Sequence, residues 1–194
     1  DIFLKFCSED VEDAVGSLRR RGWIQEDASQ KLSLHSIIMD LGRSYLKPTS
    51  KDCPHIVNGM ISYLKEELPN KTECKIREQL TKNFMEGIIG NDLSYVKLCL
   101  LYKKPEYLEK ARELCLQLQS EDKEALDLLQ KIYRLKMEWF GPLWLTSIEN
   151  VNRLIENAKM AEQYALEYSE ENSYLGKFYV ELGSELQEFA FVCK

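Results

Sequence analysis

From Asp52 to the end of the chain, apolar residues recur at the 3.6-residue spacing of amphipathic α-helices, and no stretch alternates as a strand does. The breaks between the apolar stripes are short and carry helix-ending or helix-starting residues. We expect helices to begin at these breaks, near Pro54, Thr72, Asp92, Pro105, Ser120, Thr146 and Ser173. About seven helices with short connections should pack as antiparallel hairpins.

The helix hairpins also suggest an internal repeat. Small residues such as Ala161 and Ala165 stand where two helices can approach closely, and Leu, Tyr and Trp fill the other apolar positions. This pattern favours an α-α superhelical, tetratricopeptide-like (TPR-like) fold, whose unit has about 34 residues. The strongest local match runs from Ala158 to Phe189 and includes the pair Leu182-Gly183. We therefore predict a TPR-like helical repeat domain over residues 49–194.

The stretch from Val11 to Leu46 differs, because it predicts a helix, a β-hairpin and a second helix. Gly22 follows the first helix at the position where a left-handed C-cap is needed. Trp23 then starts a strand, and residues 31–35 alternate polar and apolar as a half-buried strand does. A helix followed directly by a hairpin is typical of a winged helix, so residues 1–48 are predicted to form a winged-helix domain with a small wing. The apolar segment before Ser8 is expected to end an earlier helix that packs on the Val11 helix.

Charge and cysteine content restrict the possible classes of protein. The chain has 26 Lys and Arg residues against 32 Asp and Glu, a net charge of −6, whereas non-specific nucleic-acid binders carry a basic excess. Its six cysteines include no Cys-x-x-Cys pair, which favours reduced thiols in a cytoplasmic protein over a disulfide framework. No apolar run approaches the length of a membrane span, and no signal peptide is recognisable, so no membrane partner is expected.

Three runs of the sequence, Leu18–Ile24, Leu32–His35 and Leu46–Thr49, resemble the winged-helix region of bacterial signal-transduction NTPases of the STAND class. These proteins are NB-ARC-like, and in them an ATPase module is followed by a winged helix and TPR-like repeats. The resemblance is specific over residues 11–55 and loose thereafter. It implies that this chain, which opens at Asp1 within an element, is part of a longer protein and lacks the ATPase module that lies upstream.

The resemblance also singles out His35. In the family a Met-His-Asp motif ends the wing, and its histidine approaches the phosphates of a bound adenine nucleotide. The matching positions here are Leu34, His35 and Ser36, so the histidine is kept while its two neighbours depart from the motif. The chain has no Gly-x-x-x-x-Gly-Lys-Ser/Thr loop to hold phosphates. The resemblance therefore implies nucleotide sensing by His35 in the full-length protein and no cofactor in this part of it, while an ordinary strand-end histidine is the alternative.

Two other groups of residues are candidates for partner contacts. Arg19, Arg20 and Arg21 could touch DNA phosphate, because the Val11 helix stands where a recognition helix would. The acidic residues of the same helix favour a solvated or interdomain surface instead. Aromatic residues of the helical part are expected to lie mainly in the core, and some to line a partner-binding surface. The candidates for that surface are Tyr102, Tyr107, Tyr133, Trp139 and Trp144.

The sequence predicts neither an enzyme nor a metal site. There is no Gly-x-Ser-x-Gly motif, two histidines do not make a convincing triad, and Cys53 with His55 falls short of a four-ligand metal site. Our hypothesis is a non-catalytic regulatory part of a signal-transduction NTPase, in which the winged helix couples nucleotide state to repeats that bind a protein or peptide. The alternative is a winged-helix DNA-binding transcription regulator with a helical dimerisation or ligand-sensing domain.

Overall fold

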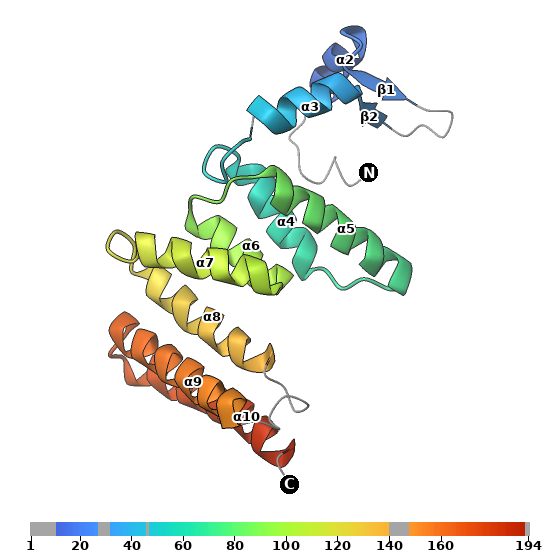
Figure 1. The fold of residues 1–194 in the computed structure, drawn as a ribbon. Helices are drawn as coiled ribbons and strands as arrows, with labels where there is room; N and C mark the ends of the chain where they lie inside the picture. The colour runs from blue at the N-terminus through green and yellow to red at the C-terminus, as the bar shows by residue number, and fades with distance from the viewer. Residues whose placement is uncertain (1–10, 27–31, 46, 140–147, 193–194) are drawn as a thin grey trace. The chain divides into compact units, whose positions relative to one another are not determined.

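The computed structural model of the protein describes residues 11–26, 32–45, 47–139 and 148–192. These residues are mainly helical and contain one two-stranded antiparallel sheet, which confirms the predicted mainly α class (Figure 1). The chain divides into two compact units, Asp1–Ser94 and Tyr95–Lys194. The proposed domain boundary at residue 48 stays a prediction.

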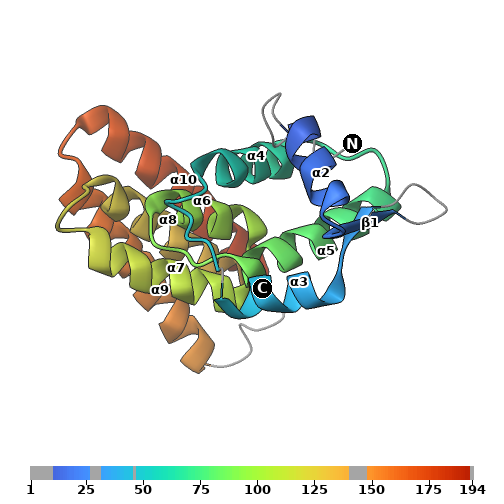
Figure 2. The same cartoon turned by 90° about the horizontal axis from the view of Figure 1, so that it is seen from above.

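The first unit opens with the predicted helix, hairpin and helix, namely α2 (Val11–Arg20), β1 (Ile24–Glu26), β2 (Leu32–Leu34) and α3 (Ser36–Tyr45). Gly22 has a φ of 70°, the left-handed value predicted for it. The Trp23 amide donates to the Leu18 carbonyl over 3.0 Å, and the Gly22 amide donates to the Arg19 carbonyl over 2.9 Å. These two bonds form a Schellman motif, which ends α2 and turns the chain into β1. Figure 2 shows α2 and the hairpin side by side.

Helices α4 (Pro54–Lys65) and α5 (Lys71–Gly87) follow in the same unit. Their connection is held by the guanidinium of Arg77, which donates to the carbonyl of Leu64 over 2.9 Å and also to that of Glu66. The same guanidinium lies 5.3 Å from the ring centre of Tyr63. Arg77 therefore satisfies carbonyl groups at the C-terminus of α4, where a helix has no backbone donors left for them.

The segment before α4 is attached to the turn after α5 by a small polar cluster. Thr49 and Ile89 form a parallel β-bridge, and the amide of Ser50 donates to the Ile89 carbonyl over 2.8 Å. The hydroxyl of Ser50, which is fully buried, donates to Asp92 over 2.6 Å and accepts from the Asn91 amide over 3.1 Å. These contacts fix the start of α4 against the turn that leads into α6.

Substitution Ser50→Ala is expected to lower the free energy of unfolding by about 2 kcal/mol, because it removes a buried hydroxyl that is hydrogen-bonded to both Asp92 and Asn91. Ser62→Ala, at an exposed position in α4, is the matched control and should change stability by less than about 0.5 kcal/mol. Urea unfolding followed by circular dichroism measures both variants. Equal effects would contradict the assigned role of the Ser50 hydroxyl.

The second unit contains the remaining helices, with α6 (Leu93–Tyr102) beginning at the boundary between the units. It continues with α7 (Pro105–Leu118), α8 (Glu124–Trp139), α9 (Ile148–Tyr168) and α10 (Asn172–Val192). Figure 1 shows α7, α8 and α9 stacked in chain order, with α10 beside α9. One apolar cluster joins the last three helices, formed by Met137, Leu154, Ala161, Ala165, Phe178 and Leu182.

Two helix starts differ from the sequence-based prediction. Thr72 was expected to cap α5, but Asn70 is the cap, because its backbone is extended and its side-chain oxygen accepts from the Glu73 amide over 2.9 Å. Helix α8 begins at Glu124 rather than at Ser120, and the Asp122 carboxylate accepts from the Glu124 amide over 2.9 Å. The predicted cap at Thr146 and the predicted helix before Ser8 lie outside the described residues.

Candidate functional site

His35 lies between β2 and α3 and contributes to both. Its backbone amide donates to the Trp23 carbonyl over 2.8 Å, which extends the hairpin by one bond. Its Nδ1 atom accepts a long hydrogen bond of 3.4 Å from the Ile37 amide, in the first turn of α3. With Nδ1 accepting, the neutral ring carries its proton on Nε2, which is the nitrogen left to meet another group. The half-buried ring is thus oriented by the backbone that surrounds it.

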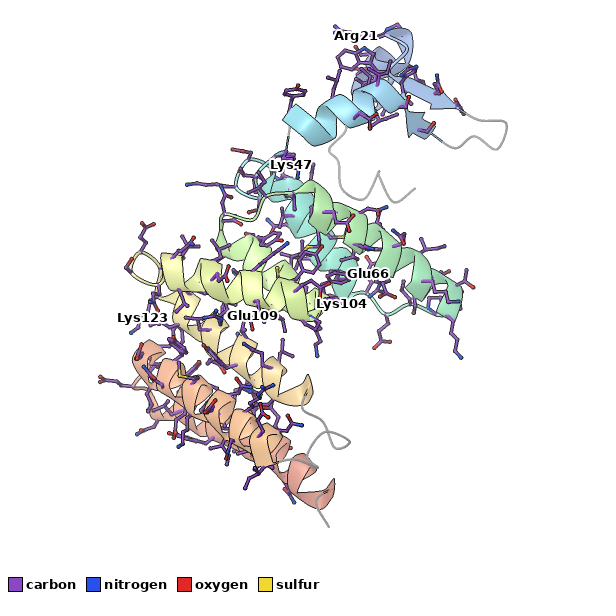
Figure 3. The ribbon with its side chains drawn as sticks, in the orientation of Figure 1. Arg21, Lys47, Glu66, Lys104, Glu109 and Lys123 are labelled. Atoms are coloured by element: carbon purple, nitrogen blue, oxygen red, sulfur yellow. The ribbon has the colours of Figure 1, made fainter. Side chains whose placement is uncertain are left out.

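The three arginines at the end of α2 have different surroundings. Arg19 pairs with Glu26 of β1 over 2.9 Å, and both side chains are well exposed. The Arg21 guanidinium lies 5.9 Å from the ring centre of Trp23, and Figure 3 marks its position at the end of α2. Arg20 is exposed. Two of the three cations therefore already have partners within their own unit, and contact with DNA stays a prediction for the group.

The tyrosines proposed for a partner surface lie largely between helices. Tyr107 is buried in the core, with its ring centre 5.3 Å from that of half-buried Tyr102. Tyr133, also half-buried, stacks on Tyr164 at 5.8 Å, so it links α8 to α9. Of the two tryptophans proposed with them, Trp144 and the side chain of Trp139 lie outside what the structure describes. This arrangement gives Tyr107 little surface to offer a partner.

Charged side chains connect the same helices. Glu109 of α7, labelled in Figure 3, accepts hydrogen bonds from Arg112 over 2.9 Å and from Lys136 of α8. Burial raises the pKa of Glu109, but the hydrogen bonds from Lys136 and Arg112 outweigh it and hold that pKa below its ordinary value. Arg134 of α8 binds two glutamates of α10, Glu181 over 2.7 Å and Glu185. These ion pairs link α8 to both α7 and α10.

A polar hollow of about 770 Å³ lies between the start of α8 and the turn that joins α9 to α10. Its lining carries four carboxylates and one lysine, together with two tyrosines: Lys123, Glu124, Glu167, Tyr168, Ser169, Glu170, Glu171 and Tyr174. The rings of Tyr168 and Tyr174 are tilted against each other with centres 5.0 Å apart. Carboxylates beside aromatic rings favour a cationic group, so the hollow suits a basic side chain better than an anion.

Tyr174, one of the residues that line this hollow, is held by Asp127 of α8. The Tyr174 hydroxyl donates to Asp127 over 2.6 Å, and the Lys131 ammonium lies 2.6 Å from the same carboxylate. Burial and the bond to Asp127 raise the pKa of Tyr174, which keeps its hydroxyl protonated. The sequence predicted only a helix start near Ser173 at this place, and the hollow was not predicted. The acidic run that ends with Glu170-Glu171 is the signal that could have indicated it.

The cysteines that the structure describes fall into buried and accessible classes. Cys99 and Cys115 are fully buried, and burial raises the pKa of each thiol to about 12. Cys74 is exposed and Cys53 is half-buried. Among the described residues, no group of three or more His, Cys, Asp or Glu side chains is placed to hold a metal ion, and Cys53 with His55 belongs to none.

At pH 8 we expect iodoacetamide to alkylate Cys74 within minutes and to leave Cys99 and Cys115 unmodified. Only the thiolate reacts, and a pKa near 12 leaves about one thiolate in ten thousand at that pH. The modified fraction of each cysteine-containing peptide can be measured by mass spectrometry. Urea should make both buried thiols reactive, and alkylation of Cys99 as fast as that of Cys74 without urea would contradict the packing described.

No protein-family model, no curated protein and no solved structure matches the chain. Within the described part of the chain, no helix is both long and apolar enough to cross a membrane.

Proposed function

We propose that the chain is a non-catalytic regulatory part of a signal-transduction NTPase, in which a winged helix couples nucleotide state to TPR-like repeats. The hollow between α8 and the α9–α10 turn is the observation that carries this proposal, because it gives the helical unit a place for a partner. In this scheme the repeats bind a protein or peptide, and His35 at the end of the hairpin senses nucleotide held by the upstream module. The chain works in the cytoplasm.

The way the helices meet supports the repeat part of the proposal. Small side chains at helix contacts let two backbones approach closely, which is how helix hairpins stack in repeat proteins. Five such side chains in α7, α8 and α9 are fully buried: Ala111, Cys115, Ala125, Ala161 and Ala165. Their burial at 0% exposure fits closely packed hairpins, as the sequence pattern predicts.

The chemistry of the hollow suggests which peptides the repeats would take. Glu167, Glu170 and Glu171 line the hollow together with a single lysine, Lys123. Glu124 is partly neutralised by Lys97, 3.0 Å away. A peptide that carries Lys or Arg would gain Coulomb attraction from the glutamates that line the hollow and ring contact from Tyr168. We therefore propose a basic segment of a protein as the partner.

Selection of random peptides displayed on phage against the immobilised chain tests this proposal. We expect enrichment of sequences rich in Lys and Arg, and a selected synthetic peptide should bind about tenfold more weakly to the double variant Glu170→Lys, Glu171→Lys. Fluorescence polarisation measures the dissociation constants. The double variant Glu113→Lys, Glu156→Lys changes charge equally at exposed positions outside the hollow and is the control. Absence of enrichment, or equal weakening by both double variants, would contradict the proposal.

The non-catalytic part of the proposal has a separate test. The purified chain should release no more phosphate from ATP than a buffer blank, because it lacks a phosphate-binding loop. Robust hydrolysis by this chain, retained through successive purification steps, would overturn it.

A further inference from the structure

A second, smaller hollow lies along α8, in the half of the helix away from the polar hollow at Lys123, a residue that Figure 3 labels. It has a volume of about 230 Å³ and is lined by side chains of three helices: Leu100 of α6, Lys131, Arg134 and Leu135 of α8, and Glu185 of α10. An engineered apolar cavity of about 150 Å³ holds benzene, so this second hollow has room for one leucine or phenylalanine side chain.

The two cations of the second hollow are already bound within the protein. The Lys131 ammonium lies 2.6 Å from a carboxylate oxygen of Asp127. The Arg134 guanidinium binds Glu181 and Glu185. With their charges neutralised in these ion pairs, Lys131 and Arg134 can add contact with their aliphatic stems, beside the two leucines. The second hollow therefore suits an apolar side chain, whereas the polar hollow suits a cation.

Both hollows lie on the same side of α8. Glu124 lines the polar hollow, and Lys131, Arg134 and Leu135 line the second one. At about 100° per residue, these four positions fall within about 100° of one another around the helix axis. A single ligand that lies along this side of α8 can therefore reach both hollows.

The distance between the two hollows is similar along α8 and along α10. Glu124 and Arg134 are ten positions apart in α8, and Tyr174 and Glu185 are eleven positions apart in α10. At a rise of 1.5 Å per residue, these separations are about 15 Å and about 17 Å. The Tyr174 hydroxyl donates to Asp127 and Arg134 donates to Glu185, so α10 is tied to α8 beside both hollows. These bonds fix the spacing of the two hollows.

We propose that one extended segment of the partner protein fills both hollows, with a Lys or Arg side chain in the polar hollow and a leucine-sized apolar side chain in the second. In an extended chain only residues an even number of positions apart point to the same side. Four positions span about 13 Å, and the length of the basic side chain covers the remainder. The partner therefore carries its apolar residue four positions from a basic one. This inference rests on the proposed function, because the basic residue occupies the hollow described there.

Fluorescence polarisation with labelled synthetic peptides tests the spacing. Each peptide has a background of Ser and Gly, one Arg-Ser-Arg motif, and one leucine placed between two and ten positions from the nearer arginine, on either side of the motif. Leucine at four positions on one side should lower the dissociation constant about tenfold relative to the peptide with serine in its place, because its side chain leaves water. Leucine at two or ten positions should change it less than about twofold.

A variant that fills the second hollow shows where the leucine binds. Leu135→Trp should remove the tenfold gain and leave the binding of the leucine-free peptide unchanged. Leu166→Trp is the matched control, because Leu166 is an exposed leucine of α9 outside both hollows, and it should keep the gain. Leu100→Phe fills the same space from α6, and it replaces Leu135→Trp if circular dichroism shows that the latter has lost helix.

The leucine-free peptide separates this inference from the proposed function. Its binding should be weakened by Glu170→Lys with Glu171→Lys, and by the same factor as that of the leucine peptide, since both peptides use the polar hollow. The role of the second hollow is overturned, and the basic partner stands, if the leucine-free peptide binds but leucine adds nothing, adds most at a spacing other than four, or adds as much in the Leu135→Trp variant. Binding of neither peptide overturns both.

Discussion

Replacing Arg134 by methionine is expected to lower the free energy of unfolding by about 2 to 3 kcal/mol. The guanidinium holds two carboxylates of α10, contacting Glu181 over 2.7 Å and both oxygens of Glu185. Its side chain is only 15% exposed, and that of Glu185 only 23%. Methionine would keep most of the apolar contact but remove the cation that holds Glu185, and it would leave Glu181 with only the exposed Lys177, 3.9 Å away. Helix α10 should therefore separate from α8 first.

The control is an Arg–Glu ion pair whose two side chains are exposed to solvent. Arg153 pairs with Glu149 one turn earlier in α9 over 2.6 Å, but these side chains are 54% and 72% exposed. Arg153→Met should therefore cost less than about 0.5 kcal/mol. Urea unfolding measures both variants, and amide hydrogen exchange in α10 shows whether that helix opens locally. Equal losses, or unchanged exchange in α10 of the Arg134 variant, would contradict the assigned role.

The helices could be predicted from the sequence because the information that places them is local. A 3.6-residue apolar period, prolines at first turns and the glycine at residue 22 act over one or two turns of chain, and all of these agree with the structure. The exact caps were less predictable. Asn70 and Thr72 are both acceptable caps by residue type, and only the backbone conformation at residue 70 decides between them.

The contacts that hold the helices together could not be predicted in the same way. Arg134 and Glu185 are 51 residues apart, and Tyr174 and Asp127 are 47 apart. A sequence with many charged residues offers many possible pairs at such separations, and only the folded arrangement selects one. The hollow has the same origin, since the start of α8 and the α9–α10 turn line it together.

The proposed partner-binding tyrosines show how little the sequence predicts about the burial of a single side chain. An amphipathic side chain such as tyrosine occurs both in protein cores and at interfaces, so the residue type alone does not predict which of the two it occupies. Tyr107 and Tyr133 were proposed for one surface, and the structure places the first in the core and the second in a stack with Tyr164. Tyr168, which lines the hollow, had no feature in the sequence to separate it from them.

Leu98→Ala is expected to lower the free energy of unfolding by about 3 kcal/mol, the second large effect that the structure indicates. Helix α6 is apolar on nearly all sides, so its sequence cannot tell which leucine is most deeply packed. Leu98 is fully buried, whereas Leu101 is only half-buried. Leu101→Ala removes the same atoms from a site that water already reaches and should cost about 1 kcal/mol. Urea unfolding of both variants measures the difference, and a loss for Leu101→Ala as large as that for Leu98→Ala would mean that α6 turns a different side to the core.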